Sequence, residues 1–358
     1  MIANVNFWEG KSVLITGHTG FKGSWLTIIL NQLGAKVSGY SLSPDNTPNL
    51  FECAKTNQFV DSNIGDIRDL GSLRKCMESI RPEIVFHMAA QPLVRDSYRH
   101  PIATIDTNVL GTANVLEAIK LTNSCKTIIN ITTDKVYSNK EWIWPYRESE
   151  SLGGHDIYSA SKACSELITN SFYKSFFETT GVGTATARSG NVIGGGDWAV
   201  DRIVPDILNS LYNNEDLDIR NPNAIRPWQH VLDPLYGYIL LAENLWRDSS
   251  LYSSAWNFGP ETDKEYSVKD LVNTFMLCSN KEIKIAYDKE QHPHEADKLR
   301  LDISKSKHNL GWFPVWSLKE TVEKILEWED CFRSGGNVQK MCIRQINEYC
   351  AQASKVHV

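Results

Sequence analysis

The sequence predicts an α/β fold in which a doubly wound parallel sheet is followed by a smaller, mixed C-terminal region. In the first half of the chain, short apolar runs rich in β-branched residues alternate with longer amphipathic stretches. Gly17, Gly20 and Gly23 stand at three-residue spacing between the first apolar run and the first amphipathic stretch. Because strand alternating with helix implies right-handed crossovers, the strands are expected to be parallel.

The periodicity predicts where the strands and helices lie. Strands are expected over residues 12–16, 36–40, 59–61, 84–88, 127–131 and 183–188. Helices are expected over residues 22–33, 70–80, 104–121, 158–177 and 234–246, with another around Leu271, Val272 and Phe275. Ligands of such a sheet bind outside the carboxyl ends of the strands, so residues that follow each strand are the candidates for function.

The regular alternation ends near residue 188, and this divides the chain into three parts. Residues 1–188 are expected to form the sheet domain, to which later segments at about 228–260 could return. Residues 189–335 form the smaller mixed region. Residues 336–358 are a C-terminal extension that could be a terminal helix, and the sequence does not indicate its role.

Composition and charge narrow the possible functions. The 358 residues are 42% hydrophobic and 22% charged, and the formal net charge is -6 without a long basic run. These values argue against general nucleic-acid binding and against docking on an anionic membrane. The N-terminus lacks the pattern of a signal peptide, and no apolar stretch is long enough to span a bilayer.

Cysteine and histidine usage argues against disulfides and metal. The eight cysteines form no C-x-x-C motif, so we expect reduced thiols in a cytoplasmic protein. No zinc ligand set is recognisable. His292 and His294 lack an evident third ligand, which favours a place in a substrate loop or on the surface over a metal site.

The glycine turn is typical of a site that binds a diphosphate. Gly17 permits a tight turn, Gly20 lets the anion approach the backbone, and Gly23 lets the helix pack closely on the strand. The N–H groups at the start of the helix then face the anion. The spacing is G-x-x-G-x-x-G rather than the commoner G-x-G-x-x-G, so an ordinary strand-to-helix turn remains the alternative.

The residues after the second and third strands are candidates for the adenosine half of a dinucleotide. The usual Asp or Glu for a ribose is missing after the second strand, where Ser41 or Ser43 could replace it. The lack of a nearby Arg or Lys favours NAD over NADP. Asp66 could accept a hydrogen bond from adenine, while Asp69 is expected to cap the helix that begins at Leu70.

Small residues follow the fourth strand. Ala89 and Ala90 would let the backbone run close to a cofactor. His87, which precedes them, is expected to be structural rather than catalytic.

A polar cluster follows the fifth strand. Thr133, Asp134 and Lys135 lie in the run Thr-Thr-Asp-Lys-Val-Tyr, and the last two are competent as acid and base. A surface turn is the alternative interpretation of this run.

Tyr158 and Lys162 form the most specific signal in the chain. Residues four apart share one face of a helix. An ammonium beside a phenol is expected to lower the phenol's pKa, which makes Tyr158 a usable proton acceptor. Such a pair can arise by chance, but this one follows the glycine turn and the polar strand end in order.

Together these motifs resemble the extended short-chain dehydrogenase/reductase family, with Asn108 and Thr133 as further shared positions. The resemblance implies an NAD-binding Rossmann domain over residues 1–188 and a nucleotide-sugar-binding region over 189–335. It implies that the cofactor is held by Gly17, His18, Thr19, Gly20, Phe21, Lys22, Gly23, Ser41, Asp66, Ile67, Ala89, Ala90, Asn108, Tyr158 and Lys162.

Within the family, the chain is most similar to enzymes that dehydrate CDP-glucose to its 4-keto-6-deoxy form. The similar segments are residues 17–26, 132–137, 188–198, 226–232 and 301–305, and the resemblance runs from residue 7 to about 330. It implies CDP-glucose as substrate, with NAD as cofactor. The substrate residues it implies are Asn191, Arg202, Arg226 and His230. Arg suits a diphosphate because its fork donates two parallel hydrogen bonds.

The resemblance also implies catalytic roles for five residues. The oxidation of C4 would use Tyr158, Lys162 and Thr133, and Asp134 would protonate the departing C6 hydroxyl. In the related dehydratases that act on dTDP-glucose, a Glu that removes the C5 proton stands at the place of Lys135. Lys135 is therefore either a partly neutral base or a cation that stabilises the enolate.

Three alternatives remain at this stage. Another nucleotide-sugar 4,6-dehydratase or a 4-epimerase of the same family would need most of the same residues, although the Asp134–Lys135 pair favours dehydration. A catalytically silent dinucleotide-binding protein is disfavoured by the intact Tyr158 and Lys162.

The helices expected at 104–121 and 158–177 are those the family pairs in a homodimer, although core packing would also explain their apolar faces.

Overall fold

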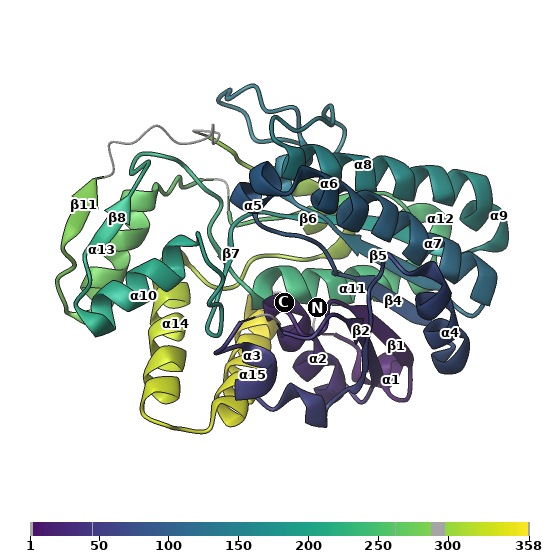
Figure 1. Cartoon of the computed structure of the whole chain (residues 1–358), viewed down its shortest axis with the longest axis horizontal. Helices are drawn as coiled ribbons and strands as arrows, with labels where there is room; N and C mark the ends of the chain where they lie inside the picture. The colour runs from purple at the N-terminus through teal and green to yellow at the C-terminus, as the bar shows by residue number, and fades with distance from the viewer. Residues whose placement is uncertain (1–2, 45, 262, 288–297, 357–358) are drawn as a thin grey trace.

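A seven-stranded parallel sheet forms the centre of the protein (Figure 1). The computed structural model describes residues 3–44, 46–261, 263–287 and 298–356. The strand order is β10-β6-β5-β4-β1-β2-β3. The strands are β1 (Ser12–Thr16), β2 (Lys36–Ser41), β3 (Asp61–Ile64), β4 (Ile84–His87), β5 (Thr127–Ile131), β6 (Gly183–Ser189) and β10 (Ala255–Phe258). The doubly wound parallel sheet expected from the sequence is confirmed.

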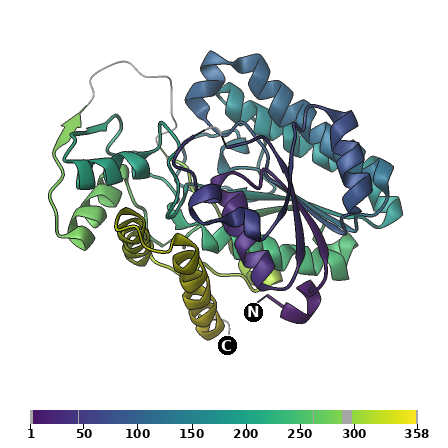
Figure 2. The same ribbon diagram turned by 60° about the horizontal axis from the view of Figure 1, so that its bottom comes forward.

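Helices cover both faces of the sheet (Figures 1 and 2). Val13 and Ile15 of β1 pack in one core with helices α2 and α11, whereas Leu14 packs in a second core with α4 and α7. The covering helices are α2 (Phe21–Gln32), α4 (Leu70–Ile80), α7 (Gly111–Thr122), α8 (Ile157–Phe172) and α11 (Leu232–Arg247). Burial on both faces explains why the central strands are continuous apolar runs.

The chain order reverses at β1, which pairs with both β2 and β4. A reversal of this kind opens a crevice at the carboxyl ends of the strands. The glycine turn follows β1 directly, so it lies at the mouth of this crevice.

The two longest expected helices are interrupted by π-helical turns. The stretch expected over 104–121 consists of α6 (Pro101–Ile105), a π turn at Asp106–Leu110 and α7. The stretch expected over 158–177 consists of α8 and a π turn at Tyr173–Phe177, followed by α9 (Glu178–Thr180). The remaining short helices of this half are α1 (Val5–Trp8), α3 (Leu50–Cys53) and α5 (Val94–Arg99).

The C-terminal region has a small core of its own, in which Ile207, Phe275 and Ile325 are fully buried. Its elements are α10 (Ile203–Asn213), β8 (Leu217–Ile219), α13 (Val268–Ser279), β11 (Ile285–Tyr287) and α14 (Leu318–Arg333). A short pair, β7 (Val192–Ile193) with β9 (Gln229–His230), connects this region to the sheet domain. Helix α11, strand β10 and α12 (Ser249–Tyr252) lie within residues 228–260, and β10 pairs with β6.

The last helix, α15 (Val338–Val356), packs against α2 and α14. Its Tyr349 hydroxyl donates to the buried carboxylate of Asp233, at 2.9 Å. The segment expected to be an extension is therefore part of the packed structure.

All eight cysteines are free thiols. Among the residues that the structure describes, no helix combines the length and the apolarity needed to cross a membrane. His292 and His294 lie outside the described residues, and the described part of the chain holds no cluster of three potential metal ligands.

Candidate active site

The turn after β1 is packed so closely that glycine is required at two positions. Gly17 has φ +78°, and a Cβ there would lie 2.7 Å from the backbone nitrogen of Ala89. A Cβ at Gly23 would lie 2.2 Å from the carbonyl oxygen of Gly17. Helix α2 therefore starts directly against the strand end, with its first N–H groups free to meet an anion. This geometry fits the diphosphate of a dinucleotide.

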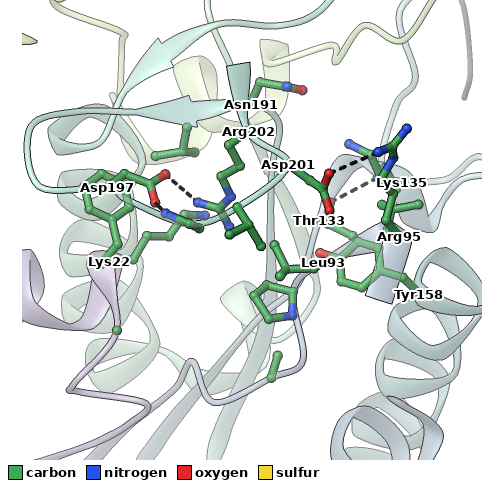
Figure 3. A pocket seen from close by; sticks show the side chains of 18 of the residues that line it. Lys22, Leu93, Arg95, Thr133, Lys135, Tyr158, Asn191, Asp197, Asp201 and Arg202 are labelled. Carbon is green, nitrogen blue, oxygen red and sulfur yellow. Dashed lines mark hydrogen bonds and ion pairs between the residues drawn. The ribbon is translucent and has the colours of Figure 1, made fainter. Parts of the chain in front are cut away.

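A large cavity lies at the carboxyl ends of the strands (Figure 3). Its volume is about 1130 Å³, and it extends from the glycine turn to α10 and β8 of the C-terminal region. The residues expected at the site that line it are Gly17, Thr19, Gly20, Phe21, Lys22, Gly23, Ser41, Asp66, Ile67, Ala89, Ala90, Thr133, Lys135, Tyr158, Lys162, Asn191, Arg202 and Arg226.

The side chains of two expected site residues pack elsewhere. The His18 ring lies against Gly39, and its Nε2 is 2.7 Å from the Ser62 hydroxyl. The His230 ring lies 4.5 Å from the Trp316 ring, and its Nδ1 accepts from the backbone N–H of Leu232. Burial lowers the pKa of His18 to about 4 and that of His230 to about 3. Neither side chain lines the cavity, so the assignment of His230 to the substrate is corrected to a neutral core residue.

Asn108 and His87 hold the loop after β4 in place. The Asn108 amide accepts from the backbone N–H of Gln91, and it donates to the carbonyl of Gln91 and to Ser161 of α8. Asn108 is absent from the cavity lining, so it holds the backbone at Gln91 rather than touching a ligand with its side chain. His87 bonds Thr16 and Thr112, and burial lowers its pKa to about 3, which confirms the structural role expected for it.

The ends of β2 and β3, where the sequence predicted the adenosine half of a dinucleotide, line one part of the cavity. Ser41 is buried and bonds the hydroxyl of Thr19 at 2.8 Å. The Asp66 carboxylate is paired with Arg68, with its oxygen 2.5 Å from the guanidinium. Asp69 accepts from the N–H of Ser72, so its expected role as a helix cap is confirmed.

Tyr158 and Lys162 face the cavity from the first two turns of α8. The Lys162 ammonium donates to the carbonyl of Ile131 at 3.1 Å, and burial lowers its pKa to about 8. Burial also raises the pKa of Tyr158 to about 12, against the effect of a hydrogen bond with Thr133. The lowered phenol pKa expected from the sequence is therefore wrong, because desolvation outweighs the hydrogen bond with Thr133 and the charge of Arg202.

Asp134 lies directly beneath the cavity in the turn after β5. Its Oδ1 accepts from the Thr133 hydroxyl at 3.0 Å and lies 3.7 Å from the Lys135 ammonium. Its Oδ2 is buried and has no hydrogen-bond partner among the described residues. Asp134 is fully buried and does not line the cavity, so this oxygen can take a proton but is not exposed to the cavity.

Three charged residues that line the cavity, Arg95, Asp197 and Asp201, were not predicted from the sequence (Figure 3). Asp197 forms an ion pair with Arg202 at 2.6 Å, and Asp201 forms one with Arg95 at 3.1 Å. Lys22 donates to Ser189 at 3.0 Å, and its pKa is lowered to about 7 by burial and by the charges of Arg202 and Lys162. The buried Oδ1 of Asn191 has no partner among the described residues, so it is available to a ligand.

A family model described as GDP-mannose 4,6 dehydratase matches residues 14–325, which is most of the chain. The chain belongs to this family. The match also confirms the membership of the extended short-chain dehydrogenase/reductases that the motifs indicated. A CDP-glucose 4,6-dehydratase of Salmonella typhimurium is 48% identical over 355 residues, which cover 98% of this chain and 99% of that protein.

Solved structures of similar proteins share the fold of this family member. A UDP-glucose 4-epimerase of Thermotoga maritima has a TM-score of 0.78 at 24% identity and covers 90% of this chain and 99% of its own. A dTDP-glucose 4,6-dehydratase of Bacillus anthracis, in complex with NAD, has a TM-score of 0.77 at 19% identity, with 91% and 99% covered.

The match to the Salmonella protein also corrects an expectation about the C-terminus. The resemblance was expected to end near residue 330, but an alignment that covers 98% of the chain must include most of residues 336–358. The sequence that forms helix α15 therefore aligns largely with that relative.

Proposed function

We propose that this protein is a CDP-glucose 4,6-dehydratase that converts CDP-D-glucose to CDP-4-keto-6-deoxy-D-glucose and water. The 48% identity to the Salmonella CDP-glucose 4,6-dehydratase, over nearly the whole of both chains, carries this proposal. The geometry supports it, since Tyr158 and Lys162 line a cavity large enough for a dinucleotide and a nucleotide sugar. Asp134 does not line this cavity, but it accepts a hydrogen bond from Thr133, which does.

The proposed reaction answers a chemical difficulty. The C5 proton of an unactivated hexose is barely acidic, so the C6 hydroxyl cannot leave directly. A ketone at C4 makes the C5 proton acidic and allows water to be eliminated. NAD, when bound, supplies the acceptor of the C4 hydride and returns that hydride to C6. Its site fits the glycine turn, the Ala89–Ala90 backbone and the ammonium of Lys162.

We assign the proton transfers to residues that face the cavity or lie directly beneath it. Tyr158 takes the proton of the C4 hydroxyl, and Thr133 hydrogen-bonds the C4 oxygen. Lys162 stays protonated, stabilises the Tyr158 phenolate and holds the nicotinamide ribose. Asp134 donates a proton to the departing C6 hydroxyl. Arg202 and Arg226 bind the diphosphate, and Asn191 supports the sugar.

Substitution of Lys135 by Met is expected to slow C5 hydrogen exchange with solvent by at least about tenfold if Lys135 is the base. The Lys135 side chain is partly exposed and lines the cavity, so its ammonium can contact a bound sugar. The same ammonium lies 3.7 Å from Asp134. Exchange is measured by mass spectrometry in deuterated water with substrate and NAD. A wild-type exchange rate would remove Lys135 as the base.

The proposed function is tested with a panel of CDP-, dTDP-, UDP- and GDP-hexoses, incubated with protein and NAD and analysed by mass spectrometry. Loss of one water from CDP-glucose alone is the expected result. Loss of water from another nucleotide sugar would overturn the assignment of CDP-glucose as the substrate. Isomers without mass change would indicate a 4-epimerase, and no change at all would indicate a silent binder.

We further propose that the protein is a cytoplasmic homodimer. The eight free thiols are consistent with a reducing compartment. Apolar side chains are exposed along the adjacent helices α6, α7 and α8 and along the π turns at Asp106–Leu110 and Tyr173–Phe177, which suits a second copy of this chain. They are Ile102, Ile105, Leu110, Leu121, Leu167 and Phe176.

Leu167→Glu is expected to convert the dimer to a monomer, because it places a charge among these exposed apolar side chains. Leu167 is 57% exposed on α8, so the isolated chain should tolerate the change. Light scattering after gel filtration measures the mass, with Leu277→Glu on α13 as the exposed control. A wild-type protein with the mass of one chain would contradict the dimer.

A further inference from the structure

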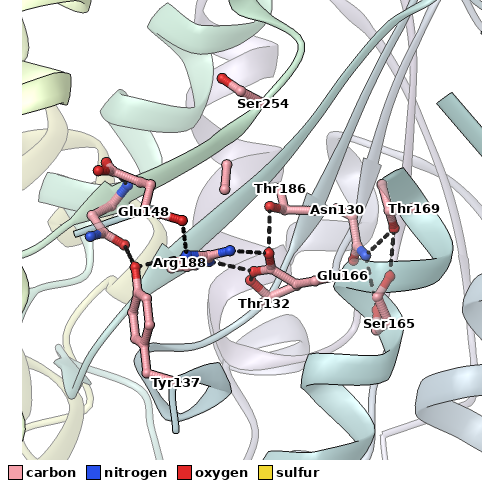
Figure 4. A network of polar contacts seen from close by, with 12 residues as sticks. Asn130, Thr132, Tyr137, Glu148, Ser165, Glu166, Thr169, Thr186, Arg188 and Ser254 are labelled. Atoms are coloured by element: carbon pink, nitrogen blue, oxygen red, sulfur yellow. Dashed lines mark hydrogen bonds and ion pairs between the residues drawn. The ribbon is translucent and has the colours of Figure 1, made fainter. Parts of the chain in front are cut away.

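A buried ion pair lies beside residues 132–137, the segment that carries Thr133 and Asp134 (Figure 4). Glu166 of α8 and Arg188 of β6 are each 3% exposed at the side chain, and their closest atoms are 2.5 Å apart. A second contact, from Arg188 Nε to Glu166 Oε1, measures 2.7 Å, so the pair is bidentate. Neither side chain lines the cavity, and the mechanism above does not use them.

The pair holds both ends of the segment that carries the catalytic side chains. Glu166 accepts from the hydroxyl of Thr132 at 2.6 Å, directly before residue 133. Arg188 donates to the hydroxyl of Tyr137 at 2.8 Å, directly after residue 136. Glu166 also accepts from Thr186 of β6 at 3.0 Å. The turn at 133–136 is thus tied at both ends to α8 and β6.

We propose that the Glu166–Arg188 ion pair is a positioning device that fixes the turn at 133–136 against helix α8. The turn supplies Thr133 and Asp134, and α8 supplies the proton acceptor Tyr158. The distance between the turn and α8 therefore sets the geometry of both proton transfers. The catalytic roles of these two elements are taken from the proposed function. A misplacement of about 1 Å can cost about 100-fold in rate.

The same pair affects the charge of Lys162, which lies one helical turn before Glu166. Burial lowers the pKa of Lys162, and the carboxylate of Glu166 opposes this effect. The other ionisable groups that interact with Lys162 are Lys22 of α2, a cation, and His87 of β4, which burial keeps neutral. The Glu166 carboxylate therefore favours the protonated form of Lys162.

Glu166→Gln tests the proposal, because the amide keeps the shape and removes the charge. We expect kcat to fall about 10- to 100-fold with KM changed less than about twofold, since the cavity lining is intact. The basic limb of the pH profile should move to lower pH, because Lys162 loses its proton more easily. Amide exchange of residues 132–137, measured by mass spectrometry without ligand, should become about tenfold faster.

Glu329→Gln is the matched control. Glu329 of α14 is also 3% exposed at the side chain and bonds Arg333 at 2.6 Å. Like Glu166 and Arg188, these two residues do not line the cavity, but this pair lies within α14 and not beside residues 132–137. Its loss should lower thermal stability and leave kcat, the pH profile and exchange of residues 132–137 unchanged. Equal behaviour of the two variants in these three readouts would overturn the proposal.

Thr132→Val keeps the ion pair and removes one of its hydrogen bonds, so it serves where Glu166→Gln does not fold. We expect a fall in kcat of about three- to tenfold, faster exchange of residues 132–137 and an unshifted pH profile. A wild-type kcat together with wild-type exchange would contradict the positioning role. The kinetic measurements use whichever nucleotide sugar the wild-type protein converts in the panel. They therefore remain valid if the substrate is not CDP-glucose. Amide hydrogen exchange is measured without any substrate.

Discussion

Tyr158→Phe is expected to abolish the reduction of nicotinamide when protein, NAD and CDP-glucose are mixed, and to lower turnover by about 10²- to 10⁴-fold. The phenolic oxygen is the proposed acceptor of the C4 hydroxyl proton, and a phenyl ring has no such atom. Absorbance of the reduced nicotinamide, followed after rapid mixing, measures the first half of the reaction directly.

The structure predicts that this loss is chemical and not a loss of folding. Tyr158 is buried with 8% of its surface exposed, and Phe keeps the packing of the ring. The free energy of unfolding should therefore change by about 1 kcal/mol or less. Tyr173→Phe, at a buried tyrosine just beyond the same helix, is the control and should retain full turnover. Unchanged turnover of Tyr158→Phe would remove Tyr158 from the mechanism.

Asp134→Asn is expected to separate the two halves of the reaction. Reduction of nicotinamide should persist, whereas loss of water should slow by about 10²- to 10³-fold, because an amide cannot protonate the departing hydroxyl. The amide oxygen can still accept from the Thr133 hydroxyl, which bonds Oδ1 at 3.0 Å, so the turn should keep its shape. Quenched samples analysed by mass spectrometry should contain sugar that has been oxidised but has kept its oxygen at C6.

The control for this variant is Asp69→Asn, which changes an exposed aspartate that caps α4. It should affect neither half of the reaction. If Asp134→Asn slowed the reduction of nicotinamide as strongly as the loss of water, Asp134 would be a structural residue and another group would supply the proton.

The sequence by itself determined the sheet, because local patterns encode buried parallel strands. The bounds of β1 and β5 agree with the expected 12–16 and 127–131, since both are continuous apolar runs between clear breaks. Strand β3 was expected at 59–61 and lies at Asp61–Ile64. It is a polar edge strand, so it has no apolar run to mark it. Strand β10 was missed because only its pairing with β6 identifies it.

The catalytic candidates were also readable, because a helix places residues four apart on one face. Tyr158 and Lys162 line the cavity from helix α8, and Thr133 lines it from the end of strand β5. Their pKa values were not readable, because the sequence does not state how deeply each group is buried. Desolvation raises the pKa of Tyr158, opposite to the expectation from its charged neighbour alone.

Only the tertiary structure decided which motif residues face the cavity. His18 and His230 lie in the motifs that carry the family resemblance, yet both rings pack into the interior. The Glu166–Arg188 pair joins a helix to a strand 22 positions further along the chain. Such contacts depend on how the sheet and helices assemble, and no local pattern of residue types records that assembly. The sequence therefore determined the fold and its chemical groups, whereas tertiary packing decided their orientation, burial and charge.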